Sequence, residues 1–269
     1  MRYRSLVLLL ALGLFVVLGL TRCGTTLRAE YVEPDDGAYA EVLGRYVDAD
    51  GRVDYAGLAK DRRRLHAAYA FVAGIDPAGL PDRDAELAFW IDAYNLAVLV
   101  GVDAYRPIDS VRDVSSPVPF LPEGAGFFYF TRFVIGGETM SLYHLEHEIL
   151  RKRYGEPRIH FAINCASGGC PKLEAVPWRG GNLSEHLDEA TRRFIADPDQ
   201  VRIHPESRRI EISPIFDWFR EDFGDLYGFL IRYSAGARAA ALRRARDEDF
   251  AIEFFAYDWS LNDRSGATN

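Results

Sequence analysis

One long helix, predicted for residues 82–105, restricts the fold more than any other segment of the sequence. Asp82 follows a proline at the position of a helix N-cap, and two acidic residues stand in the first turn, where the helix dipole favours carboxylates. Asn95 falls inside the apolar stripe of this helix, so its buried amide is expected to find hydrogen-bond partners. We take Asn95, with Trp90 of the same helix, as candidate substrate-binding residues. The stripe consists of Leu87, Ile91, Tyr94, Val98 and Val102.

Helical patterns outnumber strand patterns in the rest of the chain, and they do not alternate regularly with strands. This order predicts an α+β fold, a helix-rich single domain around a small and mainly antiparallel sheet. The apolar run 158–164 is expected to be a central strand with both faces covered, because it alternates too little to be half exposed. Further helices are predicted at 38–47, 55–75, 142–155, 182–197, 217–234 and 235–247, a strand-turn-strand unit at 127–142, a hairpin at 201–213 and a closing strand within 250–263.

The first 23 residues carry export or anchoring signals. Two arginines precede an apolar run, residues 6–20, which is slightly shorter than the roughly 20 residues of a spanning helix. Cys23 stands where a bacterial lipoprotein has its lipid-acceptor cysteine, although Arg22 departs from that pattern. Lipidation of Cys23, an uncleaved signal anchor and cleavage near Ala29 are alternatives. All three predict a domain on the periplasmic or other extracytoplasmic side of the cell envelope, and the first two attach it to the membrane.

The chain is expected to divide into four parts. Residues 1–23 form the signal or anchor segment, residues 24–38 a tether, residues 39–262 a single domain and residues 263–269 a tail. No internal repeat or long linker interrupts the third part.

Charge and motif content exclude several classes of function. The net charge is −8, and the basic residues are scattered among acidic ones, so nucleic acid is not an expected partner. The sequence has no phosphate-binding loop, dinucleotide fingerprint, nucleophile elbow or zinc-protease motif, and we predict no cofactor. His144 and His147 lie three residues apart, on the predicted helix face that points away from the core. We interpret them as solvated surface and predict no metal site.

The segment 164–171, NCASGGCP, has the residue types of a reactive or a cross-linked site. Cys165 precedes small residues, whose backbone N–H groups could serve a thiolate and a developing oxyanion. Cys170 is five residues further on, close enough for a disulfide in an oxidising compartment. Cys165 is therefore a candidate nucleophile, half of a disulfide or a buried core residue, while a zinc site lacks a fourth ligand. Asn164 and Ser167 are expected beside a substrate.

A thiol enzyme would need a base and an orienting group. Here Cys165 would be the catalytic nucleophile, and His160 or His147 would serve as its general base. Glu146 lies on an apolar helix face, where it could orient an imidazole. The backbone N–H groups of residues 166–169 would form the oxyanion site.

Five blocks of the sequence resemble the bacterial and plant family catalogued as domain of unknown function 547. They occur in the family's order and extend from about Val53 to Asn262. The resemblance implies no assigned activity, and a likeness to papain-like or transglutaminase-like cysteine enzymes is an analogy. The blocks are LAFWIDAYN, SLYHLEHEILR, PRIHFAINCASGGCPKL, ISPIFDWFREDFG and YDWSLND. The signature positions that the resemblance implies are Glu146, His147, His160, Asn164, Cys165, Ser167, Cys170 and Pro171.

Two hypotheses about function follow. In the first, the chain is an envelope hydrolase or acyl-transfer enzyme that uses Cys165 on a peptide-like substrate, and an alkylating reagent labels this thiol quickly near neutral pH. In the second, it is a non-catalytic envelope module that binds a peptide, a small molecule, a glycan or a partner protein. The second hypothesis predicts a disulfide between Cys165 and Cys170, and a mature protein two protons lighter than its reduced form.

Overall fold

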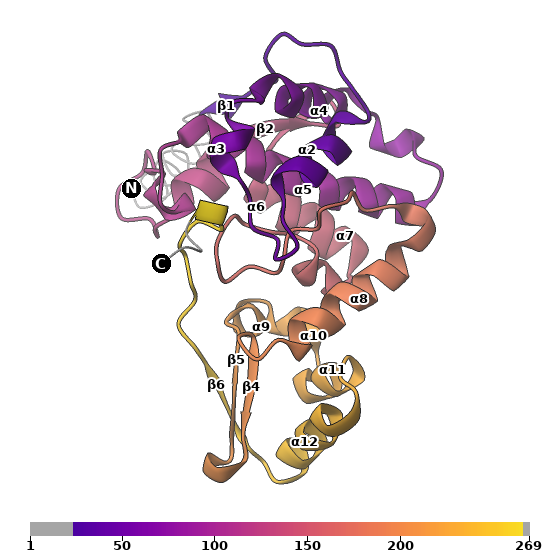
Figure 1. Ribbon diagram of the computed structural model, residues 1–269, viewed down its shortest axis with the longest axis vertical. Helices are drawn as coiled ribbons and strands as arrows, with labels where there is room; N and C mark the ends of the chain where they lie inside the picture. Colours follow the sequence, from indigo (N-terminus) through magenta and orange to yellow (C-terminus); the bar gives the residue numbers. More distant parts are fainter. Residues whose placement is uncertain (1–23, 266–269) are drawn as a thin grey trace, which may run out of the picture.

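The structure, a computed structural model, describes residues 24–265 and confirms the α+β class (Figure 1). The predicted signal or anchor segment, Cys23 included, lies outside the described residues. The α-helices are α2 (Ala38–Tyr46), α3 (Tyr55–Leu58), α4 (Arg62–Gly74), α5 (Arg83–Tyr105), α6 (Leu142–His144), α7 (Lys152–Tyr154), α8 (Leu183–Ala196), α9 (Ile215–Trp218), α10 (Arg220–Phe223), α11 (Leu226–Arg232) and α12 (Gly236–Asp247). Helices α2 to α7 lie in the upper part of Figure 1, α9 to α12 lie in the lower part, and α8 lies between them.

Short 3-10 and π-helical turns connect these helices and the strands. The 3-10 turns are η1 (Pro77–Gly79), η2 (Val111–Asp113), η5 (Pro157–Phe161), η6 (Gly180–Asn182) and η7 (Pro205–Ser207), and the π-helical turns are η3 (Gly126–Phe130) and η4 (Leu145–Arg151). The strands are β1 (Thr26–Leu27), β2 (Arg132–Ile135), β3 (Glu138–Ser141), β4 (Val201–His204), β5 (Arg209–Ile212) and β6 (Ala251–Phe254).

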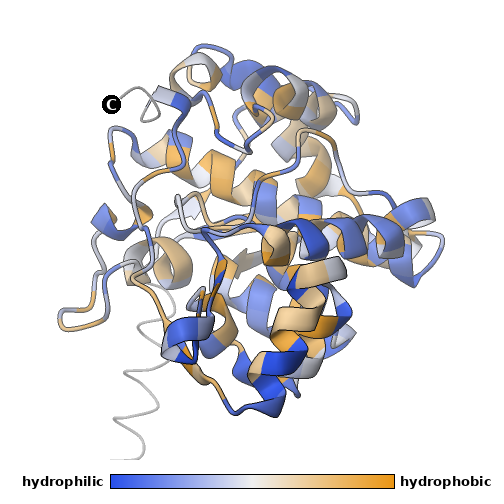
Figure 2. Cartoon of the chain, turned by 60° about the horizontal axis from the view of Figure 1, so that its bottom comes forward, coloured by the Kyte–Doolittle hydropathy of each residue, from blue (hydrophilic) through white to orange (hydrophobic). Residues whose placement is uncertain are grey.

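Helix α5 lies at the centre of the core. The Asp82 carboxylate accepts a hydrogen bond from the Ala85 amide (2.8 Å), which confirms the predicted N-cap. Within the described residues, α5 is the one helix long and apolar enough to cross a membrane, and 78% of its most apolar stretch is buried inside the protein. Figure 2 shows that hydrophilic and hydrophobic residues alternate along the helices at the surface.

The strands pair into two three-stranded sheets, where the sequence predicted a single sheet. In the first, β2 pairs antiparallel with β3 and parallel with β1. In the second, β5 pairs antiparallel with β4 and parallel with β6. Gly136 and Gly137 connect β2 to β3 with positive φ angles of 61° and 78°, which a tight hairpin turn requires. Both predicted hairpins are therefore confirmed, and each gains a parallel third strand. The first hairpin is shorter than predicted, because residues 127–130 belong to the π-helical turn η3 and the strand begins at Arg132.

The prediction of a central strand at 158–164 is wrong. This segment begins in the 3-10 turn η5, where Pro157 takes the first helical position and the Glu156 carboxylate accepts from the Arg158 amide (3.1 Å). Phe161 packs on Phe194 of α8, with 4.9 Å between the ring centroids. An apolar run that is buried on all sides does not distinguish a strand from a helical turn by its pattern.

The helical segment 142–154 begins and ends as predicted. The Ser141 hydroxyl accepts a hydrogen bond from the His144 amide (3.2 Å) at its start. Gly155 ends it in the left-handed conformation, with φ at 58°.

The middle of this segment is the π-helical turn η4, which differs from the regular helix that the sequence predicted. A π-helical turn has hydrogen bonds between residues five apart, so it holds more residues per turn than an α-helix. Consecutive side chains are then separated by a smaller rotation, and Glu146 and His147 line the same cavity. The expectation that His147 points away from the protein is therefore wrong.

Part of the predicted tether, residues 24–38, is built into the fold. Strand β1 belongs to it, and the Leu27 carbonyl accepts a hydrogen bond from the Tyr69 hydroxyl (2.9 Å). The Glu30 amide donates to Nδ1 of His66 (3.1 Å). The folded part thus extends N-terminal to residue 39.

The end of the chain returns from the lower part of the molecule to the N-terminal half (Figure 1). The Asn262 carbonyl oxygen Oδ1 accepts from the Tyr55 hydroxyl (2.7 Å), and its amide nitrogen donates to Oδ1 of Asn164 (3.2 Å). Leu261 pairs with Ser167 through an isolated β-bridge. The segment after β6 therefore closes over the cysteine loop, which we define as residues 165–170.

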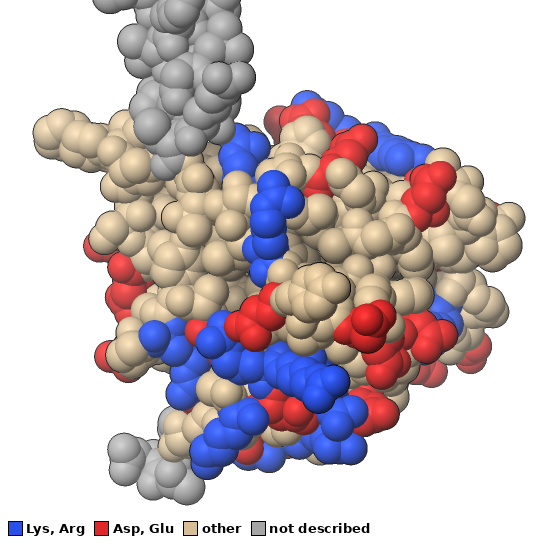
Figure 3. All heavy atoms as spheres, turned by 90° about the horizontal axis from the view of Figure 1, so that it is seen from above, with Lys and Arg blue, Asp and Glu red and all other residues tan. Residues whose placement is uncertain are grey.

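Acidic and basic side chains lie beside one another on the face shown in Figure 3. Ion pairs on the helix surfaces, such as Lys152 with Glu148 (2.7 Å) and Arg192 with Asp188 (2.8 Å), contribute little to stability because solvent screens them. The fold therefore depends on its core and its buried hydrogen bonds.

Candidate functional site

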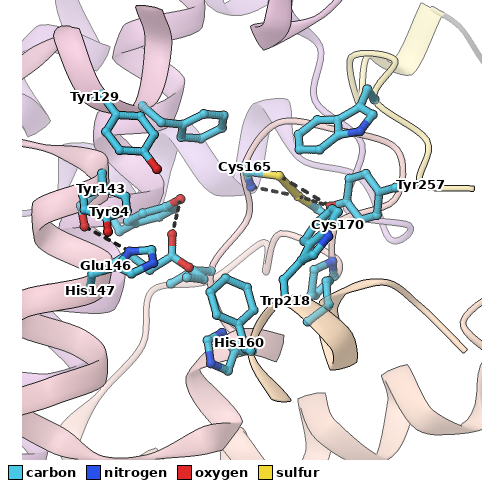
Figure 4. Close-up of a pocket in the computed structure, with 16 residues that line it drawn as sticks. Tyr94, Tyr129, Tyr143, Glu146, His147, His160, Cys165, Cys170, Trp218 and Tyr257 are labelled. Atoms are coloured by element: carbon cyan, nitrogen blue, oxygen red, sulfur yellow. Dashed lines mark hydrogen bonds between the residues drawn. A yellow bond between two sulfur atoms is a disulfide. The ribbon is translucent and has the colours of Figure 1, made fainter. Parts of the chain in front are cut away.

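All four predicted catalytic residues line one cavity of about 210 Å³. Figure 4 shows Glu146 and His147 on one side of this cavity and the cysteine pair on the other, with His160 below. Two phenylalanines, four tyrosines and two tryptophans make up half of the lining. The sixteen lining residues are Tyr94, Phe128, Tyr129, Tyr143, Glu146, His147, His160, Ile163, Cys165, Cys170, Pro171, Ile215, Trp218, Phe219, Tyr257 and Trp259.

Glu146 is the carboxylic acid of this cavity. Burial raises its pKa to about 7, because the protein around it disfavours the charged form. The Tyr94 hydroxyl donates to its Oε2 (3.3 Å) and partly offsets this rise. Near neutral pH, Glu146 can therefore gain or lose a proton in response to what occupies the cavity.

His147 belongs to a stack of rings beside Glu146. Its ring lies 4.0 Å from that of Tyr143, which in turn lies 4.3 Å from that of Tyr129. Burial lowers the pKa of His147, so the imidazole is neutral at pH 7. Its Nδ1 lies 3.2 Å from the Tyr143 carbonyl oxygen. A neutral ring that donates a hydrogen bond from Nδ1 to this oxygen has Nε2 as its acceptor atom.

His160 is bound to a carboxylate and not to a thiol. Its Nε2 lies 2.7 Å from Oδ2 of Asp222, which also accepts two hydrogen bonds from Arg151 (2.6 and 2.9 Å). Although burial alone would raise the pKa of Asp222, the hydrogen bonds from His160 and Arg151 hold it well below its usual range. Phe219 stacks on the His160 ring at 4.0 Å. Among the described residues, no hydrogen bond joins His160 or His147 to a cysteine.

The two cysteines form a disulfide bond, with 6.3 Å between their Cα atoms. The Cys165 amide also donates to Sγ of Cys170 (2.9 Å). The Ser167 hydroxyl lies 3.1 and 3.3 Å from the two sulfur atoms, and the Tyr257 hydroxyl lies 3.2 Å from Sγ of Cys170. Of the alternatives that the sequence left open, the structure has the disulfide, and Cys165 carries no free thiol in it.

Three of the four backbone amides that were expected to form an oxyanion site, those of Ala166, Gly168 and Gly169, donate hydrogen bonds within the protein. The Ala166 amide donates to Oδ1 of Asn164 (2.8 Å). The amides of Gly168 and Gly169 donate to backbone carbonyls of the C-terminal segment (2.8 and 2.9 Å). A side chain on Gly169 would lie 2.8 Å from the Tyr257 ring. The small residues of the loop therefore allow the C-terminal segment to approach.

The other predicted site residues lie around the cavity and do not line it. Trp90 is buried in the core. The Asn95 amide donates to the Ala162 carbonyl (3.0 Å), and its Oδ1 accepts from the Asn164 amide (2.8 Å). Asn164 and Ser167 line a second, more polar hollow of about 340 Å³, which also borders the disulfide. Asn95 thus positions the segment that leads into the cysteine loop.

Sequence reasoning missed the aromatic wall of the cavity. Trp218 at the end of α9 lies 4.8 Å from Tyr257, and Tyr257 lies 4.7 Å from Trp259, measured between ring centroids. These residues belong to the blocks ISPIFDWFREDFG and YDWSLND. The aromatic residues in these two blocks were therefore a signal from which the wall of the cavity could have been predicted. Asp222, the partner of His160, is in the first of these blocks.

The fold and the cavity together define an α+β domain with an aromatic cavity, a titratable carboxylic acid and a disulfide at its edge. A family model described as "Protein of unknown function, DUF547" matches residues 77–195, and over this segment the chain is similar to that family. The match confirms the resemblance and contains the predicted catalytic residues, while Trp218, Tyr257 and Trp259 lie beyond it. No curated protein and no solved structure matches the chain.

Proposed function

We propose that this chain is a ligand-binding module of the cell envelope, and that the aromatic cavity is its binding site. The observation that carries the proposal is the lining, in which eight aromatic rings surround one carboxylic acid. Ligand pockets are concave and mostly apolar, with a few polar groups that fix orientation. The basic and apolar segment at residues 1–23 supports export, and the domain is then held on the extracytoplasmic side by this segment or by a lipid on Cys23.

In this proposal the disulfide shapes the cavity edge and takes no part in chemistry. Cys165 and Cys170 both line the cavity, and the bond between them restricts the loop that closes it. An oxidising envelope compartment would preserve such a bond.

Ligand-observed NMR with a set of small amines, sugars, dipeptides and aromatic acids tests the proposal. We expect at least one class to bind the wild-type protein and to lose binding in Trp218→Ala, which removes an exposed wall of the cavity. Phe254→Ala removes an exposed aromatic side chain from strand β6, outside the cavity lining, and should leave binding unchanged. If no compound distinguishes the wild type from Trp218→Ala, the cavity is not a binding site.

A thiol-dependent hydrolase or acyl-transfer enzyme is the second candidate. It is favoured by one observation, that Cys165, Glu146, His147 and His160 all line the same cavity. Such an enzyme would require reduction of the disulfide, and either Glu146 or His147 would then have to serve as the base, because His160 is bound to Asp222. Enzymatic release of a product only in the presence of a reductant, and its loss in Cys165→Ser, would favour this candidate over the binding module.

A further inference from the structure

The charges around the cavity are unbalanced. Glu146 is the one carboxylic acid among its sixteen lining residues, and none of these described residues is Lys or Arg. The nearest basic side chain on the same helical segment, Arg151, is bound by both carboxylate oxygens of Asp222. Within the described part of the chain, Glu146 forms no ion pair and receives its one hydrogen bond from Tyr94. A negative charge on Glu146 therefore has no ion-pair partner among the described residues, and Arg151, which acts on it at longer range, is already paired with Asp222.

The lining around this carboxylate has the composition of a cation site. The faces of Trp, Tyr and Phe rings carry partial negative charge and attract a cation within about 6 Å of the ring centre. The lining includes Trp218 and Trp259, and tryptophan is the ring type with the strongest attraction. In Figure 4, Trp218 lies on one side of the cavity, and Tyr129 and Tyr143 lie on the other. A buried carboxylate without a partner is costly, and a ligand that brings positive charge removes that cost.

The volume of the cavity limits what can enter. Pockets for drug-sized ligands span about 300–1,000 Å³, and this cavity measures about 210 Å³. It can hold a charged head group or the end of a side chain, with the rest of a larger ligand outside. Trp218 and Tyr129, which are 47% and 50% exposed, lie where such a ligand would leave the cavity.

We infer that the cavity binds an organic ammonium group, with Glu146 as its counter-ion and the surrounding rings as an aromatic cage. The inference rests on the proposed binding function and names the chemical class of its ligand. An alkylated ammonium fits best, because its methyl groups contact the rings while its charge faces Glu146.

Protonation of Glu146 provides a signature of this site. The charged and titratable groups around it are Tyr94 from α5, Tyr129 from η3, His147 and Arg151 from its own segment, His160 from η5, Asp222 from α10, and Tyr257. Because burial raises the pKa of Glu146 to about 7, a bound cation must displace a proton below that pH. Affinity for an ammonium ion should thus fall by up to about tenfold per pH unit below pH 7, while a neutral ligand should show no such fall.

Calorimetric titration with tetramethylammonium, choline and the uncharged choline isostere 3,3-dimethyl-1-butanol tests the inference. At pH 8 we expect both cations to bind the wild-type protein at least about tenfold more tightly than the isostere. Glu146→Gln should remove this preference, whereas Glu148→Gln, on the exposed side of the same turn, should keep it. Two further titrations use vesicles of a choline-headed lipid and a peptide with trimethylated lysine. Binding in one of them identifies whether the ammonium group comes from a lipid or from a protein.

Two results would overturn the inference. Equal binding of the cations and the isostere would make the cavity an apolar site, and unchanged cation binding in Glu146→Gln would remove the proposed counter-ion. If none of the cations binds while another compound class binds in a Trp218-dependent manner, the ammonium inference fails and the binding function stands. If no class binds at all, both fail.

Discussion

The protonation state of Glu146, a residue of the cavity lining, changes the stability of the folded protein with pH. Burial raises its pKa from 4.5 to about 7, so the folded protein holds this proton more tightly than the unfolded chain does. Below pH 4.5 the carboxyl group is neutral in the folded and the unfolded protein, so its burial does not lower the free energy of unfolding. As the pH rises from 4.5 to 7, the unfolded chain ionises first, and folded-state stability is lost. Above pH 7 the penalty is constant.

Replacing this carboxyl should therefore stabilise the unliganded protein, and only at the higher pH. Glu146→Gln is expected to raise the free energy of unfolding by about 2 kcal/mol at pH 8, and to leave it nearly unchanged at pH 4. Urea unfolding at the two pH values measures the difference. Glu148→Gln serves as control, because that side chain is exposed and paired with Lys152. An equal gain at both pH values would mean that the effect does not come from the charge.

At the scale of elements, α5 and the start of the cysteine loop are joined by one side chain. Asn95 of α5 uses both ends of its amide group to hold the backbone of Ala162 and Asn164. Its side chain is buried, so its loss leaves a donor and an acceptor unpaired. This contact positions the loop that borders the cavity.

Asn95→Ala should loosen the loop more than it weakens the rest of the fold. We expect a loss of about 2 kcal/mol in stability and faster hydrogen exchange at the Asn164 amide, because its acceptor is gone. Asn182→Ala is the matched control, since Asn182 precedes α8 without a side-chain capping bond. If the Asn164 amide exchanges at the wild-type rate in the variant, Asn95 does not hold the loop.

The elements that local sequence determines could be predicted. The cap at Asp82, the start of the helical segment at residue 142 and the turn between β2 and β3 depend on residues close in sequence, and all three are confirmed. The segment 158–164 and the orientation of His147 could not be predicted in this way. The first is buried on all sides, which leaves no periodic pattern, and the second depends on a π-helical turn that a regular helical wheel does not contain.

At the scale of the whole molecule, the site depends on contacts between distant parts of the chain. The family match ends at residue 195, yet Trp218 and Tyr257 complete the cavity from beyond it. Asn262 bonds to Tyr55 and Asn164 and thereby holds the C-terminal segment over the cysteine loop. The fold brings the four residues that the sequence proposed as catalytic to one cavity, and it also shows which rings surround them.

The same closure gives the cysteine loop its role. Gly168 and Gly169 donate their amides to the C-terminal segment, and Tyr257 packs against the disulfide. A loop this short gains little from chain entropy, so the disulfide contributes at most about 2 kcal/mol to global stability. Its larger effect is on the shape of the cavity edge.

The state of the two cysteines in the exported protein tests the account most directly. The protein is purified from the envelope and denatured in the presence of an alkylating reagent, without a reductant. Its intact mass is then measured. We predict that Cys165 and Cys170 remain unlabelled and that the mass is two protons below that of the reduced form. Rapid labelling of Cys165 in the native protein near neutral pH would contradict the account, and it would restore the thiol enzyme as the leading function.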